Sequence, residues 1–203
     1  SNYIFFDFEA TQDNPERKHK VNLGVSEYFD TDDNIIHYNN EEFCEWLFDK
    51  KHSNYTIIAH NGKGYDYQFI MKWIYTKTSY KPFVIYNGSK IMTFIIKEGF
   101  NIRFIDSVNF LAMRLTDFSK TFGITEFKKG YYPHYFNSDA NTNYIGPIPP
   151  ASDFGCDSFK NKDREKFLDW YEEKVNTNYI WDNKKELLEY CISDVKLLKA
   201  GMK

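Results

Sequence analysis

The sequence has few cysteines, with only Cys44, Cys156 and Cys191 among 203 residues. Their odd number, without a CxxC pair or a regular spacing, argues against a disulfide framework and against a zinc site. We expect three reduced, partly buried thiols, which suit an intracellular, reducing compartment.

Long apolar runs and repeats are also missing. No segment approaches the roughly 18 apolar residues that a membrane-spanning helix needs, and no internal repeat or low-complexity tract is found. The chain starts without methionine and without a secretory signal peptide, so we expect a piece of a longer protein. With 42% hydrophobic and 27% charged residues, it can bury a core.

The formal net charge of −3 conceals an uneven distribution. Residues 1–50 carry 12 acidic and 4 basic side chains, whereas residues 51–130 carry 5 acidic and 12 basic ones. The basic central segment permits a nucleic-acid partner, and a solvated basic surface explains it equally well.

Hydrophobic periodicity and turn residues predict a mixed α/β sheet flanked by helices. The three N-terminal strands have short connections, which predicts an antiparallel meander, and Asn40 is a candidate helix cap. Residues 130–156 are irregular, and loops of this length are more often functional than accidental. We expect strands over residues 3–8, 21–28, 35–38, 56–59, 90–97 and 101–108, and helices from residue 40 and over 65–76, 111–122, 162–176 and 183–198.

Two carboxylates end the first predicted strand. Asp7 and Glu9 are two residues apart, so their side chains point to the same face of the strand. Burial and mutual repulsion would raise the pKa of both groups unless cations neutralise them, and Mg²⁺ or Mn²⁺ prefers such oxygen ligands. Strand-end carboxylates in solvent are the simpler alternative.

A second acidic position follows the short strand at 56–59. Asp66 lies in the first turn of the next predicted helix, after a glycine-containing loop that includes His60 and Asn61. Simple capping of the helix explains Asp66 equally well. We expect His60 to be a histidine with satisfied hydrogen bonds and not a ligand.

A third motif lies on the last predicted helix. Tyr190 and Asp194 are four residues apart and therefore share one helix face. A phenol one turn from a carboxylate could direct a water molecule toward a metal that this carboxylate holds. A chance pairing on an amphipathic helix is the alternative.

The three motifs in this order resemble the proofreading 3′→5′ exonuclease domains of family-B DNA polymerases. These are DEDD exonucleases of the subclass with tyrosine in the last motif, and their fold is ribonuclease H-like. The similarity is greatest to the protein-primed branch, found in viruses, linear plasmids and virus-like transposons. It spans residues 3 to about 199 and extends to the segments 106–108, 128–132 and 146–150.

The resemblance implies a site with two divalent cations, Mg²⁺ or Mn²⁺. It implies that Tyr190 and Glu9 orient the attacking water and that Lys129 stabilises charge on the scissile phosphate, with Lys128 as a competitor for that role. The implied metal ligands are Asp7, Glu9, Asp66 and Asp194.

The resemblance also implies contacts with single-stranded DNA. Tyr65 would contact the terminal nucleotides, and a core aromatic is the alternative for that residue. The other implied DNA contacts are Thr11, Asn61, Ser107 and Val108. Loop length between Asn61 and Asp66 varies in the family, so the role of Asn61 is less firmly implied than that of Asp66.

We therefore expect residues 1–203 to form a single exonuclease domain of a longer protein-primed DNA polymerase, without the polymerase palm. The expected partners are a single-stranded DNA 3′ end, a polymerase domain in cis and a priming terminal protein. A viral replication site, the mitochondrion and the cytoplasm all fit. The alternatives are a free-standing DEDD exonuclease acting on RNA or DNA, and a catalytically silent module that binds DNA or a priming protein.

Overall fold

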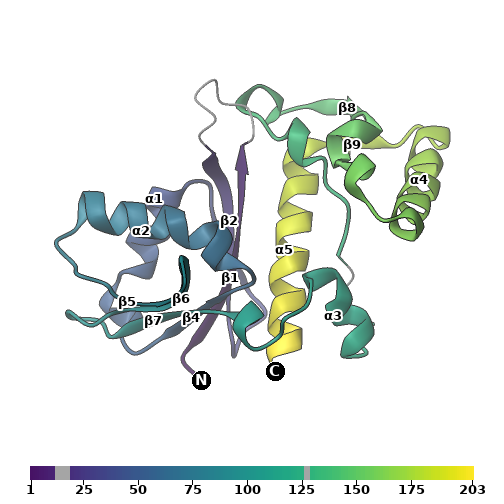
Figure 1. Ribbon diagram of the computed structural model, residues 1–203. Coiled ribbons are helices and arrows are strands. Elements are labelled where there is room, and N and C mark those ends of the chain that lie inside the picture. Colours follow the sequence, from purple (N-terminus) through teal and green to yellow (C-terminus); the bar gives the residue numbers. More distant parts are fainter. Residues whose placement is uncertain (12–18, 126–128) are drawn as a thin grey trace. The chain divides into compact units, whose positions relative to one another are not determined.

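The structure of the protein is a computed structural model, which describes residues 1–11, 19–125 and 129–203 (Figure 1). The chain forms two compact units. The first comprises Ser1–Glu9, Val21–Lys129 and Cys191–Lys203, and the second comprises Ala10–Lys20 and Gly130–Tyr190. The predicted domain boundaries, 1 and 203, stay a prediction.

The first unit is built on a sheet that has seven strands in the described residues, in the order β3-β2-β1-β4-β7-β6-β5. The central strands β1, β4 and β7 are parallel, whereas β3 pairs antiparallel with β2, and β6 pairs antiparallel with β7 and β5. The strands are β1 (Tyr3–Thr11), β2 (Lys20–Tyr28), β3 (Asn34–His37), β4 (Thr56–Ala59), β5 (Phe83–Asn87), β6 (Lys90–Ile96) and β7 (Ile102–Asp106). The mixed α/β sheet predicted from the sequence is confirmed.

Two helices, α1 (Asn40–Leu47) and α2 (Asp66–Lys77), cover one face of this sheet (Figure 1). The core beneath them is largely aromatic. Phe43 of α1 packs on Phe6 and Phe8 of β1, with ring centroids 5.0 and 4.7 Å apart. Pairs of this kind contribute about 0.5–1.5 kcal/mol beyond the burial of their area. The aromatic residues of β1 thereby fix the strand that carries the first two carboxylates.

The C-terminal part of α5 (Asn183–Met202), from Cys191 onward, belongs to the same unit and lies on the other face of the sheet (Figure 1). Val195, Leu197 and Leu198 are buried there. Lys199 is also buried, and its ammonium group lies 2.7 Å from a carboxylate oxygen of Glu27 on β2. This ion pair joins α5 to the sheet.

Several predicted elements need correction. The cap of α1 is Asn39, whose side chain accepts a hydrogen bond from the Glu42 amide, and not Asn40. Helix α3 (Leu115–Thr121) starts four residues later than predicted. Strand β5 was not predicted, because its side chains are mostly exposed and show no clean alternation.

The second unit contains helix α4 (Asn161–Asn176) and a two-stranded antiparallel sheet of β8 (Ile145–Pro147) and β9 (Ile180–Asp182). Its core is again aromatic, with Phe154 packing on Phe167 of α4 and on Trp181 of β9. The irregular segment predicted at 130–156 consists of short 3₁₀ turns and β8.

None of the helices in the described part of the chain has both the length and the apolar composition needed to cross a bilayer.

Candidate active site

Strand β1 presents Asp7 and Glu9 on one face, and Phe6 and Phe8, which alternate with them, occupy the other. Phe6 and Phe8 point into the core under α1 and α2, so the alternation of the strand turns Asp7 and Glu9 to the opposite side. Glu9 is 6% exposed, and Asp7 keeps some access to solvent. The side-by-side placement predicted from the sequence is confirmed.

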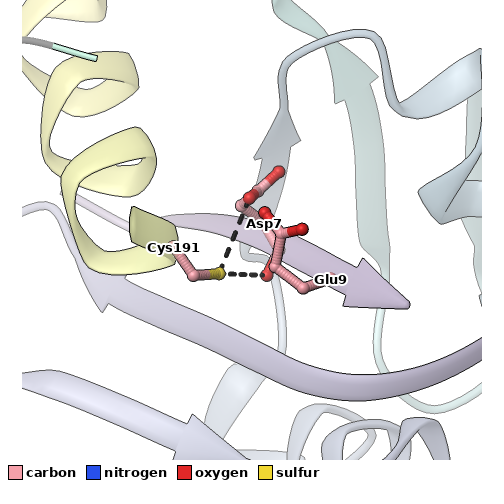
Figure 2. A group of neighbouring side chains, drawn as sticks. All are labelled: Asp7, Glu9 and Cys191. Atoms are coloured by element: carbon pink, nitrogen blue, oxygen red, sulfur yellow. Dashed lines mark hydrogen bonds between the residues drawn. The ribbon is translucent and has the colours of Figure 1, made fainter. Parts of the chain in front are cut away.

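Helix α5 brings Cys191 and Asp194 to the same place. The two residues are three positions apart and share one helix face. The Cys191 sulfur lies 3.5 Å from the backbone oxygen of Asp7 and 3.6 Å from its Oδ2 atom (Figure 2). Ligand atoms of Asp7, Glu9 and Cys191 all lie within 4.8 Å of one another.

Asp66 reaches the cluster from the first residue of α2. The turn that precedes it, Gly62–Gly64, is tight: a Cβ atom at Gly62 would lie 3.0 Å from Ala59 and from the ring of Tyr67. Asp66 itself is 4% exposed. Asp66 is the first residue of α2 and not its N-cap, which is Tyr65, and its charge contributes to the repulsion that raises the pKa of Glu9.

Burial raises the pKa of all four carboxyl groups, and repulsion by neighbouring carboxylates adds to the increase for Asp7, Glu9 and Asp66. Burial, followed by the charge of Asp194, raises the pKa of Asp7 to about 7. Burial also raises the pKa of Glu9 well above its usual range, with further increases from Asp7, Asp194 and Asp66. Burial and then Asp7 raise the pKa of Asp66. Four acidic groups from β1, α2 and α5 therefore form one electrostatically coupled cluster.

Lys129 partly compensates this charge. Its ammonium group lies 2.6 Å from Oδ2 of Asp194, and the Lys129 side chain is 24% exposed. Burial raises the pKa of Asp194, and Lys129 lowers it. The structure thus places Lys129 beside the cluster, whereas Lys128 lies outside the described residues.

The carboxylate set fits a hard divalent cation. Asp194 is 4% exposed, and its second oxygen, Oδ1, has no hydrogen-bond partner within the described part of the chain. A buried carboxylate oxygen without a partner is costly, and a cation would satisfy it. Several carboxylate oxygens without a histidine suit Mg²⁺ or Mn²⁺.

Buried Asp106 organises the loops next to the cluster. Its Oδ1 atom accepts hydrogen bonds from the backbone amides of Asn61, at 2.9 Å, and Val108, at 3.0 Å. Asn61 has a left-handed backbone, with φ of 58°, and its side chain is exposed. Nδ1 of His60 lies 2.8 Å from the Ser107 hydroxyl. Asn61, Ser107 and Val108 are thus held together, and His60 has a hydrogen-bond partner, as predicted.

Tyr65 precedes α2 and lies near the cluster. Its ring packs edge-on against Phe69, with centroids 5.2 Å apart. Burial raises the pKa of its hydroxyl, followed by the charges of Asp66, Glu9 and Asp7. Tyr65 is only partly buried, so it is not a core aromatic.

Two predicted site residues belong to the second unit. The Tyr190 hydroxyl lies 3.3 Å from Nε2 of His134, and its ring packs on Tyr132. Thr11 is buried, and its hydroxyl donates to the Lys20 backbone oxygen. The catalytic role of Tyr190 and the DNA contact of Thr11 stay predictions.

A family model described as DNA polymerase type B, organellar and viral, matches residues 49–203. The chain belongs to this family of type B DNA polymerases. The DNA polymerase of Kluyveromyces lactis is 32% identical over 151 residues, which cover 72% of the chain and 15% of that protein. A probable DNA polymerase of Ascobolus immersus is 30% identical over 204 residues, covering 85% of the chain and 16% of that protein.

Among solved structures, Phi29 DNA polymerase complexed with single-stranded DNA has a similar fold. It aligns with 98% of the chain at a TM-score of 0.62 and 15% identity, and the match covers 30% of its own length. This type B polymerase segment spans about 15% of the length of the first curated relatives that match its sequence. The resemblance to protein-primed family-B polymerases, predicted from the motifs, is confirmed at the level of family and fold.

One tripeptide of the chain needs comment. Asp30-Thr31-Asp32 has the same sequence as a polymerase palm signature, although we did not expect a palm signature in this chain. It follows β2 and leads to β3, and the Thr31 carbonyl accepts a hydrogen bond from Lys199. It is a connection within the sheet.

Sequence reasoning missed three residues near the predicted ones. Cys191 contacts Asp7, Asp106 joins two loops, and His134 contacts Tyr190. Asp106 fell within segment 106–108, already noted for its family resemblance, so it could have been found, whereas His134 was noted only as part of the irregular segment 130–156. The contact of Cys191 with Asp7 joins residues 184 positions apart, and no local pattern indicates it.

Without bound cations, the free energy of unfolding should fall as the pH rises from 6 to 8. The pKa of Asp7 is about 7 in the folded protein, against 3.8 for an unperturbed aspartate. The stability from this retained proton is complete below pH 3.8 and is lost as the pH rises through 7. Between pH 6 and 8 the loss is about 1.4 kcal/mol from Asp7 alone.

Denaturant titrations with a chelator measure this loss. In Asp7→Asn, the free energy of unfolding should depend less on pH, by the amount that Asp7 contributes in the wild type. Contributions from the histidines are the same in both proteins and cancel in the comparison. Equal slopes in the two proteins would contradict the coupling described above.

Proposed function

We propose that this polymerase segment is a metal-dependent 3′→5′ exonuclease that hydrolyses phosphodiester bonds at single-stranded DNA 3′ ends. It would serve as the proofreading part of a protein-primed family-B DNA polymerase. The observation that carries the proposal is the meeting of four carboxylates, three of them buried, from β1, α2 and α5, two of them more than 180 residues apart along the chain. Such a cluster is unstable without cations, which makes it suitable for binding them.

Asp7, Glu9 and Asp194 would hold one divalent cation, and Asp7 with Asp66 would hold the second. Two bound cations stabilise the entering and leaving oxygens of an in-line displacement at phosphorus. The orphaned Oδ1 of buried Asp194 and the raised pKa of Asp7 and Glu9 support this assignment.

The remaining groups act on the water and on the phosphate. Glu9, and Tyr190 one turn before Asp194 in the sequence of α5, would orient the attacking water. Lys129 would move from Asp194 to the scissile phosphate as cations take over the carboxylate. Its partial exposure and its 2.6 Å contact support such an exchange.

The DNA end would be gripped by stacking and by backbone contacts. Tyr65, partly exposed next to Asp66, would stack on a terminal base, which contributes about 1–3 kcal/mol for any base. Asn61 and Val108, whose backbone amides both donate to Asp106, would contact the strand, as would Ser107 and Thr11. A mismatched end frays at little cost and therefore reaches this site more often as a single strand.

A directional digestion tests the proposal. A single-stranded DNA labelled at its 5′ end is incubated with the chain and Mn²⁺. The DNA should be shortened from its 3′ end, which gives a ladder of labelled products and free mononucleotides. A phosphorothioate bond at the 3′ terminus should block it. Equal digestion of a matched RNA would favour the free-standing nuclease, and binding without digestion would favour the silent module.

Lys129→Met should lower exonuclease turnover by about 10²-fold, because removing one charge that stabilises the transition state typically costs that much. Digestion rates at saturating DNA, in Mg²⁺ and in Mn²⁺, measure the effect. Lys120→Met, at an exposed lysine of α3, is the control and should leave the rate unchanged. An unchanged rate in Lys129→Met would remove this residue from the mechanism.

A further inference from the structure

Tyr190, which the proposed function assigns to the attacking water, has two aromatic neighbours within the second unit. Its ring packs against the ring of Tyr132, with centroids 5.7 Å apart, and its hydroxyl lies 3.3 Å from Nε2 of His134. The His134 ring stands edge-on to the Tyr190 ring, with centroids 5.3 Å apart. Tyr132 and Tyr190 are buried, whereas His134 is partly exposed. The hydrolysis proposed above gives no role to either neighbour.

The Tyr132 ring is fixed from its far end. Its hydroxyl donates to Oδ1 of Asn183, at 2.8 Å, and the indole N–H of Trp181 donates to the same atom, at 3.3 Å. Asn183 is 1% exposed, and its side-chain amide donates to the Asn141 carbonyl. Buried polar groups that all have partners hold one arrangement, because breaking any of these hydrogen bonds leaves a group unsatisfied. Tyr132 is therefore a rigid support for the ring of Tyr190, but ring packing leaves the Tyr190 hydroxyl free to rotate.

His134 is placed to fix that hydroxyl. It opens the 3₁₀ turn His134–Phe136 directly after Pro133, whose ring restricts the backbone. The turn is held by Asn137, which is 1% exposed and whose side-chain amide donates to the Ala10 carbonyl at 3.0 Å. The imidazole is thus carried by a restrained turn, at hydrogen-bond distance from the phenol.

We propose that His134 is a positioning residue, whose Nε2 atom accepts a hydrogen bond from the Tyr190 hydroxyl and thereby fixes its direction. In a neutral imidazole one ring nitrogen is an acceptor. A phenol that donates to this nitrogen keeps the lone pairs of its oxygen to accept a hydrogen bond from the attacking water. The water then turns a lone pair, and not a hydrogen atom, toward the phosphorus. His134 exchanges no proton and acts through Tyr190 alone, so the role rests on the proposed function of Tyr190.

Nuclear magnetic resonance of ¹⁵N-labelled histidine tests the hydrogen bond independently of activity. At a pH above the titration of the imidazole, Nε2 of His134 should give the resonance of an unprotonated nitrogen, assigned by its loss in His134→Gln. It should shift in Tyr190→Phe, which keeps the ring and removes only the hydroxyl. Tyr135→Leu, at a neighbour in the same turn that is 67% exposed, is the matched control and should leave it in place. A protonated Nε2, or a resonance that Tyr190→Phe does not shift, overturns the proposal.

Digestion of single-stranded DNA measures the effect of His134 on turnover. His134→Leu should lower kcat by about 10-fold with an unchanged KM for DNA, since a misplacement of about 1 Å can cost up to about 10²-fold in rate. His134→Gln should recover most of the loss, because its side-chain carbonyl is again an acceptor. Thermal unfolding of each variant checks the fold, and Tyr135→Leu should keep the wild-type kcat. A raised KM with unchanged kcat in His134→Leu would overturn the positioning role.

Combining the variants separates positioning from general support of the fold. The double variant His134→Leu with Tyr190→Phe should be no slower than Tyr190→Phe alone, because the hydroxyl through which His134 acts is already missing. Rate losses that multiply in the double variant would contradict this. A wild type that digests DNA no faster than His134→Leu does would refute the positioning role alone. A wild type that digests no DNA would refute the proposed function, and the role of His134 in turnover with it.

Discussion

Asp7→Asn is expected to lower exonuclease turnover by at least about 10³-fold while leaving the chain folded. Asp7 is the one carboxylate assigned to both cations, and charge stabilisation by a preorganised site is usually the largest single contribution to such catalysis. The substitution keeps the shape of the side chain and removes its charge. It also relieves the repulsion that raises the pKa of Glu9, so the metal-free protein should become no less stable.

Release of mononucleotides from a single-stranded DNA 3′ end in Mn²⁺ measures the rate, and circular dichroism checks the fold. Asp33→Asn, at an exposed aspartate between β2 and β3, is the matched control and should keep full activity. Isothermal titration with Mn²⁺ should show weaker binding to Asp7→Asn alone. Full turnover in that variant would refute the assignment of the cluster.

The sequence was sufficient for those parts of the fold in which local signals and tertiary structure agree. Strand β4 was predicted with its observed bounds, Thr56–Ala59, because a β-branched apolar run buried in a parallel sheet has an unmistakable pattern. The strand pair β6 and β7 was predicted from its turn at Gly99, which has the positive φ, 76°, that glycine tolerates.

Elements whose formation depends on neighbours were harder to predict. Edge strand β5 leaves Phe83 and Ile85 about half exposed, at 54% and 45%, so periodicity gave no signal. Its hydrogen bonds to β6 define it instead. The start of α3 was placed too early because Leu111 to Arg114 are apolar or helix-compatible residues in an extended or turn conformation.

The candidate site likewise contains residues that local motifs predict and residues that they do not. The four carboxylates and Tyr65 were identified through motif order, since each motif is local. The role of Asp106 as an acceptor for two amides, and the contact of Cys191 with Asp7, depend on segments 45 and 184 residues apart meeting in space. The spacing of residues along the chain does not predict such long-range contacts.

Glu27→Ala is expected to destabilise the chain by about 3–5 kcal/mol, the typical loss when one partner of a buried ion pair is removed. Glu27 is 1% exposed, and its two oxygens lie 2.7 Å from Lys199 and 3.4 Å from Lys196. Lys199 is itself 4% exposed and donates to the Thr31 carbonyl, so it cannot turn to water without moving α5. The variant therefore leaves the buried Lys199 ammonium with the exposed Asp32 carboxylate, 3.4 Å away, in place of a buried partner.

Thermal unfolding should show the midpoint of Glu27→Ala lowered by roughly 10 °C. Removing both charges, with Glu27→Leu and Lys199→Met together, should cost much less, because no charge then stays buried. Asp117→Ala, which breaks an exposed pair with Arg114, should change stability by no more than about 1 kcal/mol. Since Asp194 lies on the same helix, Mn²⁺ affinity should fall with Glu27→Ala and recover in the double variant. If the double variant lost as much stability as single variants at Glu27 and Lys199 lose in sum, the two residues would not be coupled. The position of α5 would then depend on its apolar contacts alone.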